Sequence, residues 1–108
     1  MYVRAARFEG IDTANIDRDI EEFRKMVRME ERPEGMPEET FTTLRSGVKR
    51  VMSLVDRDAG ASLDLVFTDS ADDAQRVHQA LDSLTPPEGA GKRMSVQTFE
   101  LLMDEDLS

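Results

Sequence analysis

Cysteine and tryptophan are absent from this chain of 108 residues, and tyrosine and histidine each occur only once. Without cysteine there can be no disulfide bond, no thiol nucleophile and no cysteine-ligated metal. Basic residues are also scarce, because 14 lysines and arginines stand against 23 aspartates and glutamates, giving a net charge of −9. That balance argues against binding to nucleic acid or to an anionic membrane surface, since both require a basic surface.

Long apolar runs are missing as well. No stretch approaches the ~20 residues of a membrane span, and no basic segment followed by an apolar one indicates a secretory signal. Hydrophobic residues make up 39% and charged residues 34% of the chain, which is typical of a globular protein. We therefore expect one cytoplasmic domain, residues 1–108, with neither a nucleic-acid nor a membrane partner.

Apolar periodicity divides the chain into two kinds of segment. Alternation or strand-like length predicts four strands, at residues 2–8, 48–55, 62–68 and 93–103. Helical spacing predicts two long helices, at residues 15–31 and 70–84, and a short helix at residues 37–44.

Local signals place several ends of these segments. Ser70 is positioned to cap the second long helix, and Pro86-Pro87 forbids its continuation. Between the second and third strands, residues 56–60 predict a hairpin turn in which Gly60 supplies a positive φ. Apart from the short helix, the order is strand, helix, strand, strand, helix, strand.

This order is that of a ferredoxin-like α+β protomer, β-α-β-β-α-β. Two right-handed crossovers place both long helices on one face of a single antiparallel sheet. The other face then has no cover of its own, although Leu63, Leu65 and Phe67 share one face of the third strand. Because monomers rarely leave a large apolar patch exposed, we expect a second copy of the chain to cover it.

Four segments resemble a known superfamily: MYVRAARFEG, LVDRDAG, FTDSADDA and LTPPEGAGKRMSVQTFEL. The chain is similar to the dimeric α/β-barrel proteins of the antibiotic-biosynthesis-monooxygenase-like branch, over nearly its whole length except residues 32–47. The resemblance implies a homodimer whose two sheets face each other as a dimeric α/β barrel. It also implies a ligand pocket inside each protomer, between the sheet and its helices. Members of the superfamily include cofactor-independent quinone-forming monooxygenases and haem-degrading enzymes.

The haem-degrading pattern is matched poorly in this chain. Those enzymes use an asparagine on the first strand, a tryptophan near the end of the third and a histidine on the second helix. Here the only asparagine is Asn15, Thr68 stands at the position of the tryptophan, and only His78 matches. We therefore expect neither haem nor any other cofactor.

His78 lies at the edge of the apolar stripe of its helix, beside Val77. One interpretation makes it a general base or an axial ligand, and the other makes it a half-buried histidine whose ring is satisfied by a carboxylate or water. The second is favoured, because spacing places no further acid, base or ligand beside it. Asp56 and Asp58 begin a calcium-loop pattern that fails at its later positions, so no metal site is expected.

Three arginines lie on predicted strands, at positions Arg4, Arg7 and Arg50. A charge on a covered sheet face must find a partner, and Asp64 and Glu100 are strand carboxylates of the opposite sign. The arginines either orient an oxygen-rich ligand or form ion pairs at strand ends and at the dimer rim. The second interpretation is favoured.

Two functional hypotheses remain open. The first is a small homodimeric protein that binds a small apolar or aromatic metabolite. The alternative is a cofactor-independent monooxygenase-like enzyme acting on a phenolic or polyketide-like substrate, which needs donors aimed at the developing negative charge. His78, Asp64 and Thr68 are the candidate ligand-binding residues. The gap between the sheet and the helices either holds a pocket near His78 or is packed solid.

Overall fold

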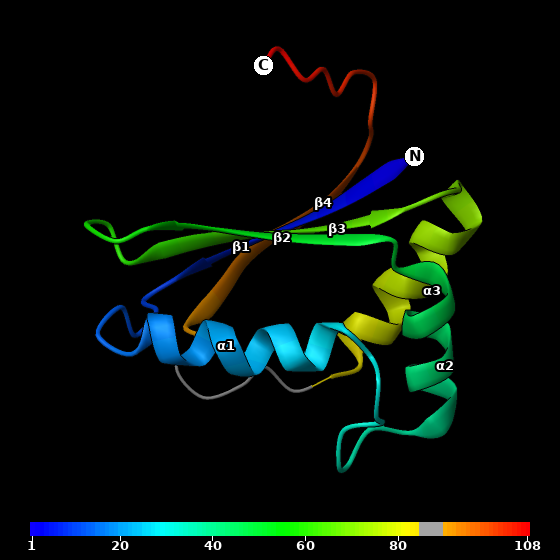
Figure 1. Ribbon diagram of the computed structural model, residues 1–108, viewed down its shortest axis with the longest axis horizontal. Coiled ribbons are helices and arrows are strands. Elements are labelled where there is room, and N and C mark those ends of the chain that lie inside the picture. Colours follow the sequence, from blue (N-terminus) through cyan, green and yellow to red (C-terminus); the bar gives the residue numbers. More distant parts are fainter. Residues whose placement is uncertain (85–89) are drawn as a thin grey trace.

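A computed structural model describes residues 1–84 and 90–108, so the predicted helix stop at Pro86-Pro87 lies outside the described residues. The fold is α+β, with four strands and three helices among these residues. In chain order the elements are β1 (Tyr2–Glu9), α1 (Ile16–Val27), α2 (Glu38–Gly47), β2 (Arg50–Asp56), β3 (Ala61–Thr68), α3 (Ala71–Asp82) and β4 (Lys92–Glu100) (Figure 1).

The four strands form one antiparallel sheet in the order β2-β3-β1-β4, which is compatible with a ferredoxin-like fold. The hairpin between β2 and β3 is confirmed. Its turn is closed by Asp56, whose Oδ1 accepts a hydrogen bond from the amide of Ala59 at 3.0 Å, and Gly60 has a φ of +65°. Glycine adopts this conformation without the steric cost that a side chain would add.

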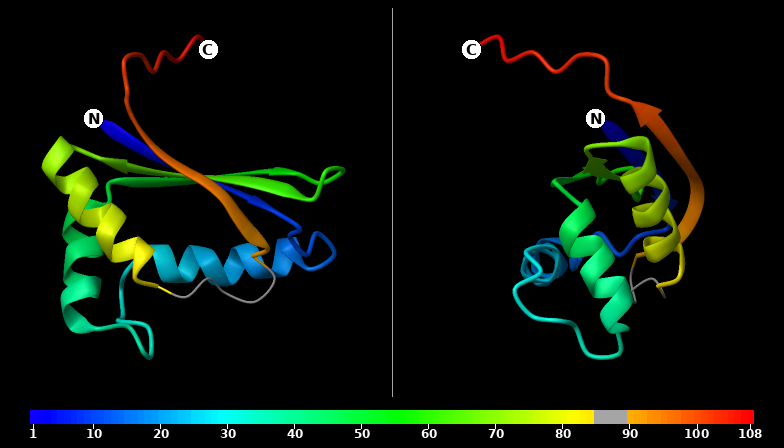
Figure 2. Two further views of the ribbon diagram at one scale, coloured as in Figure 1. Left: turned by 180° about the vertical axis from the view of Figure 1, so that it is seen from behind. Right: turned by 90° about the vertical axis from the view of Figure 1, so that its right-hand side faces the viewer.

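All three helices lie on one side of the sheet, and the C-terminal residues 101–108 lead away on the other side (Figures 1 and 2). The predicted cap of α3 is confirmed, because the Ser70 hydroxyl accepts a hydrogen bond from the amide of Asp73 at 3.1 Å. The carboxylate of Asp73 bonds to Arg76 instead of completing a reciprocal capping box.

Several predicted ends were wrong. The final strand ends at Glu100 and not at residue 103. Its partner strand β1 begins at Tyr2, which pairs with Glu100, and only one further hydrogen bond follows, from the amide of Leu101 to the Met1 carbonyl. Helix α1 ends at Val27 and not at residue 31, since Met29 takes a left-handed φ of 55°. The short helix is longer than expected, and α2 stands as a third helix of 10 residues.

The core lies between the sheet and the pair α2 and α3. Its central cluster joins the buried side chains of Met36, Leu44, Val66 and Val77. Helix α1 contributes no buried residue. The packing that positions α3 therefore comes from α2 and from strands β1 and β3 of the sheet.

Gly47 ends α2 against α3, and its lack of a side chain permits the close approach. A Cβ atom built there would lie 2.6 Å from Cγ2 of Val77, which is too short for any real contact. Replacing a helical glycine by alanine ordinarily stabilises a protein by about 1 kcal/mol. Here we expect Gly47→Ala to lower the free energy of unfolding by about 1–3 kcal/mol, because the core is overpacked.

Urea denaturation of Gly47→Ala beside Ser46→Ala, an exposed neighbour in the same helical turn, measures this effect. The exposed variant should stay within about 0.5 kcal/mol of the parent protein. A gain in stability from Gly47→Ala would show that the close packing of α2 on α3 is wrong.

Candidate functional site

The helix-covered face of the sheet carries charged and polar side chains. Residues that pair directly across neighbouring antiparallel strands share a face. Arg4 on β1 is opposite Val66 on β3 and Thr98 on β4, and the next inward position brings Ala6 opposite Asp64. Arg4 and Asp64 therefore lie on the same face as Val66, under the helices.

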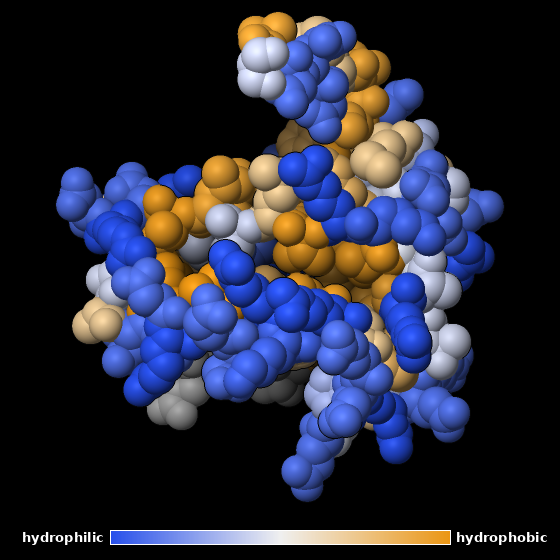
Figure 3. All heavy atoms as spheres, in the orientation of Figure 1, coloured by the Kyte–Doolittle hydropathy of each residue, from blue (hydrophilic) through white to orange (hydrophobic). Residues whose placement is uncertain are grey.

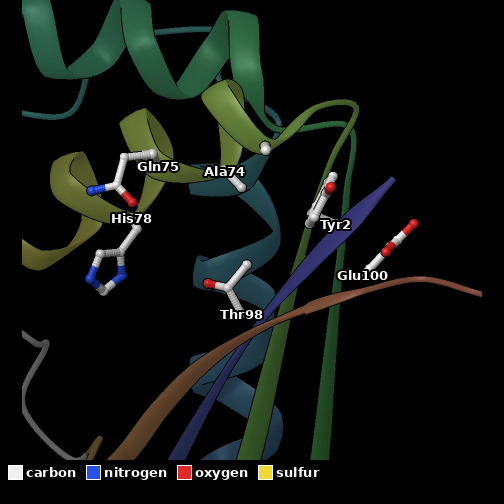
Figure 4. A pocket seen from close by; sticks show the side chains of 7 residues that line it. Tyr2, Ala74, Gln75, His78, Thr98 and Glu100 are labelled. Carbon is white, nitrogen blue, oxygen red and sulfur yellow. The ribbon is translucent and has the colours of Figure 1, made fainter.

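A pocket of about 180 Å³ opens between this face and α3. Its wall is formed by side chains from β1, α3 and β4 (Figure 4). The lining residues are Tyr2, Ala71, Ala74, Gln75, His78, Thr98 and Glu100. Of the two alternatives left by the sequence, the gap near His78 thus holds a pocket.

His78 is fixed in the wall of the pocket by a buried arginine. Nε of Arg4 donates a hydrogen bond to Nδ1 of His78 at 3.1 Å. A guanidinium has only donors, so Nδ1 must be the acceptor, and the neutral ring carries its proton on Nε2. In this arrangement His78 offers an N–H donor at Nε2.

Arg4 is 8% exposed, which is rare for a charged side chain. Burial lowers the pKa of Arg4, and the nearby positive charge of Arg93 lowers it further. Asp82 and Asp64 act in the opposite direction, but each is already bonded to another donor. Asp82 accepts from Arg93 at 2.7 Å, and Asp64 accepts from the Ser53 hydroxyl at 2.8 Å.

The predicted site residues are only partly brought together. His78 lines the pocket, whereas Asp64 and Thr68 do not. Thr68 is buried at the end of β3, and its hydroxyl has no hydrogen-bond partner among the described residues. The residue that the sequence interpretation did not connect to His78 is Arg4. The sequence does hold one indication of this contact, because Arg4 alternates with Tyr2, Ala6 and Phe8 on one face of the first strand.

The other two strand arginines do not pair with the predicted carboxylates. Arg7 bonds to Glu9 at 3.3 Å on the surface, and the guanidinium of Arg50 lies 5.6 Å from the centre of the Phe67 ring. Arg50 also approaches Asp104 of the C-terminal segment at 3.8 Å. Ion pairing of strand arginines is thus found at exposed positions, with partners other than Asp64 and Glu100.

The opposite sheet face carries apolar side chains of unequal exposure, because Val3 and Phe67 are buried there and Arg50 lies over the Phe67 ring. Met52, Leu54 and Phe99 lie there and are 37%, 46% and 49% exposed. The register places them on the same face as Leu63 and Leu65. Apolar atoms gather at the level of the sheet, between the charged surface of α1 and the C-terminal segment (Figure 3).

Within residues 1–84 and 90–108, no three histidine, aspartate or glutamate side chains are grouped to hold a metal ion. In the same described segments, none of the helices has the length and apolar character needed to traverse a membrane. No protein-family model, curated protein or solved structure matches the chain.

Asp64 provides a test of the polar layer under the helices. Burial raises its pKa above the usual 3.8, although the Ser53 hydrogen bond and the charge of Arg4 oppose this. The folded state therefore binds a proton more readily than the unfolded state, and stability falls as the pH rises through this range. We expect Asp64→Asn to be more stable than the parent protein at pH 7, with the difference disappearing below the usual pKa of 3.8.

The measurement is the difference between urea midpoints of variant and parent at each pH. Asp73→Asn is a control of opposite sign, because the hydrogen bond from Arg76 lowers the pKa of Asp73. Its ionised form stabilises the folded state, so this variant should be less stable than the parent at pH 7 and should approach it in acid. A loss of stability at pH 7 in Asp64→Asn would contradict the prediction.

Proposed function

We propose that this protein is a homodimeric α/β barrel that binds a small aromatic molecule of one ring between its sheet and α3. The pocket beside His78 is the observation that carries the proposal. The pocket is half open to solvent, and its volume of about 180 Å³ leaves room for one ring, since a closed cavity of about 150 Å³ holds benzene.

The size of the pocket selects between the two functional hypotheses. Pockets for drug-sized molecules occupy roughly 300–1,000 Å³. A fused polyketide needs a volume in that range, whereas a single ring with one small polar group fits into about 180 Å³. The geometry therefore favours a one-ring ligand over a polyketide substrate.

The lining suits a ring that carries a polar group. Ala71 and Ala74 provide small apolar contacts at the start of α3, and Tyr2 provides an aromatic one. Gln75, Thr98 and His78 add hydrogen-bonding groups, which is the mixture expected of a small-molecule site. We infer that the apolar end holds the ring and that the polar end fixes its orientation.

The exposed apolar side chains on the sheet face opposite the helices support the dimer. Four strands at about 4.8 Å spacing and eight residues of about 3.4 Å rise give a projected area on the order of 500 Å². A standard interface buries about 800 Å² of accessible surface on each partner, and side chains raise the accessible area above the projected one. A second copy, related by two-fold symmetry, brings the same apolar face to this one.

NMR titration with p-cresol tests the pocket. Tyr2 and His78 are the only tyrosine and histidine in the chain, and both line it, so their ring signals report binding without ambiguity. We expect saturable shifts of both ring signals at millimolar or lower concentrations of p-cresol, because the ring enters beside them.

Two matched substitutions control this experiment. Thr98→Phe should fill the pocket and abolish the shifts, whereas Thr42→Phe, on the exposed surface of α2, should leave them unchanged. Absence of saturable shifts in the parent protein would sink the proposed function, as would equal binding to both variants.

A further inference from the structure

The C-terminal segment, residues 101–108, is unusually apolar for a stretch of chain outside the core. Four of its eight residues are leucine or methionine, whereas solvated terminal segments are poor in such side chains. Met103 is 76% exposed and Leu107 is 91% exposed. Apolar side chains gathered in this way on the surface mark a contact with another molecule.

The segment is tied to its own protomer only near its start. The amide of Leu101 donates to the Met1 carbonyl at 2.8 Å, and Asp104 approaches Arg50 at 3.8 Å. Beyond Asp104, the hydrogen bonds among the described residues stay within the segment and join Ser108 to Asp106. Residues 105–108 are therefore available to a second molecule.

The direction of the segment points to a second copy of the chain. It leaves the sheet on the side opposite the helices, where Met52, Leu54 and Phe99 are exposed (Figures 1 and 2). In a dimer whose sheets face each other, this side of each protomer faces its partner. Stacked sheets lie about 10 Å apart, and eight extended residues span about 27 Å, so the segment is long enough to reach the partner's sheet.

The area of the sheet face calls for a further contribution to the interface. Its projected area is on the order of 500 Å², and Val3 and Phe67 are already buried within their own protomer. A standard interface buries about 800 Å² on each partner with 20–30 residues, or roughly 30–40 Å² per residue. Eight more residues would add about 300 Å², which is of the order of the missing area.

Alternation divides the segment into an apolar and an acidic side. In an extended chain, successive side chains point to opposite sides. Met103 and Leu107 then share one side, and Asp104 and Asp106 share the other side with Leu102. Because carboxylates are costly to remove from water, the side of Met103 and Leu107 is the one that can be buried.

We propose that residues 101–108 form an arm that packs on a second copy of the chain, with Met103 and Leu107 buried against the partner's exposed sheet face. Glu105 lies between these two residues, and Arg7 and Arg50 on the same sheet face supply charges of opposite sign. This inference rests on the homodimer of the proposed function and assigns a second, separate contact to it.

The test is the dissociation constant of the dimer, measured by analytical ultracentrifugation of a dilution series. We expect Met103→Ser combined with Leu107→Ser to raise the dissociation constant at least tenfold, because two apolar side chains lose their favourable burial. Leu102→Ser makes the same kind of change on the acidic side and should stay within threefold of the parent protein. All three side chains are exposed in the protomer, so its folding should not change.

The outcomes separate the arm from the dimer. An unchanged dissociation constant in the double variant would overturn the arm, while dissociation of the dimer by Leu54→Glu would still uphold the contact between the sheets. An equal loss of affinity in Leu102→Ser would overturn the assignment of Met103 and Leu107 to the contact. If the parent protein is a monomer, the proposed dimer falls and this inference falls with it.

Discussion

Replacing Leu54 by glutamate is expected to halve the mass of the protein in solution. The proposed dimer of two 12.2 kDa chains should become a monomer, because a carboxylate at this position would be buried against a second apolar face. Leu54 is 46% exposed on the sheet face opposite the helices, so the substitution leaves the protomer core untouched. Light scattering behind gel filtration at micromolar concentration measures the mass directly.

Val55→Glu is a closely matched control. Val55 is the next residue of β2 and is 41% exposed, but the register places it opposite Ser62, on the helix-covered side. It should remain dimeric. A monomer mass for the parent protein would refute the dimer. Equal masses for the two variants would show that the dimer interface does not lie on the sheet face that carries Leu54.

Leu44→Ala is expected to produce the largest loss of stability among single core substitutions. Leu44 is 1% exposed and lies in the central cluster with Val66 and Val77. Truncating a fully buried leucine costs about 2–5 kcal/mol, through lost burial and the cavity left behind. A domain of this size has a total stability of only about 5–15 kcal/mol, so the loss is a large fraction of the whole.

Urea denaturation with Leu102→Ala as the control separates burial from residue type. Leu102 is 89% exposed in the C-terminal segment, and its truncation should change the free energy of unfolding by less than about 0.5 kcal/mol. If Leu44→Ala loses less than about 1 kcal/mol, the contact of α2 with the sheet and α3 is looser than the structure indicates.

The order of the elements could be predicted because the apolar residues of each long segment repeat with the spacing of either a strand or a helix. The hairpin at Gly60 and the cap at Ser70 were also readable, since both depend on residues within the same turn. The end of β4 depends on a distant part of the chain, because Glu100 pairs with Tyr2, and the start of β2 depends on where α2 ends. Val48 was expected in a strand, but its amide completes α2 by bonding to Leu44, and β2 begins only at Arg50.

The sequence identified His78 as a candidate site residue, but it did not identify Arg4, the residue to which His78 is bonded. His78 stood out as the only histidine, on the edge of an apolar stripe. Its bond to Arg4 joins residues 74 positions apart, and only the tertiary arrangement of α3 over β1 brings them together. Asp64 was expected to pair with a strand arginine, but it accepts a hydrogen bond from Ser53 on the neighbouring strand instead.

The strand order also has a consequence for how the chain reaches its fold. β1 lies in the middle of the sheet, but its neighbours are β3 and β4, which end at residues 68 and 100. During synthesis, β1 is made long before both of its neighbours, and one of its edges has no hydrogen-bonding partner until residues 92–100 have been added. Pairings so distant in sequence are slow to form, and an open strand edge is prone to aggregation. Completion of the sheet by β4 is therefore the step at which newly made chains are most in need of protection.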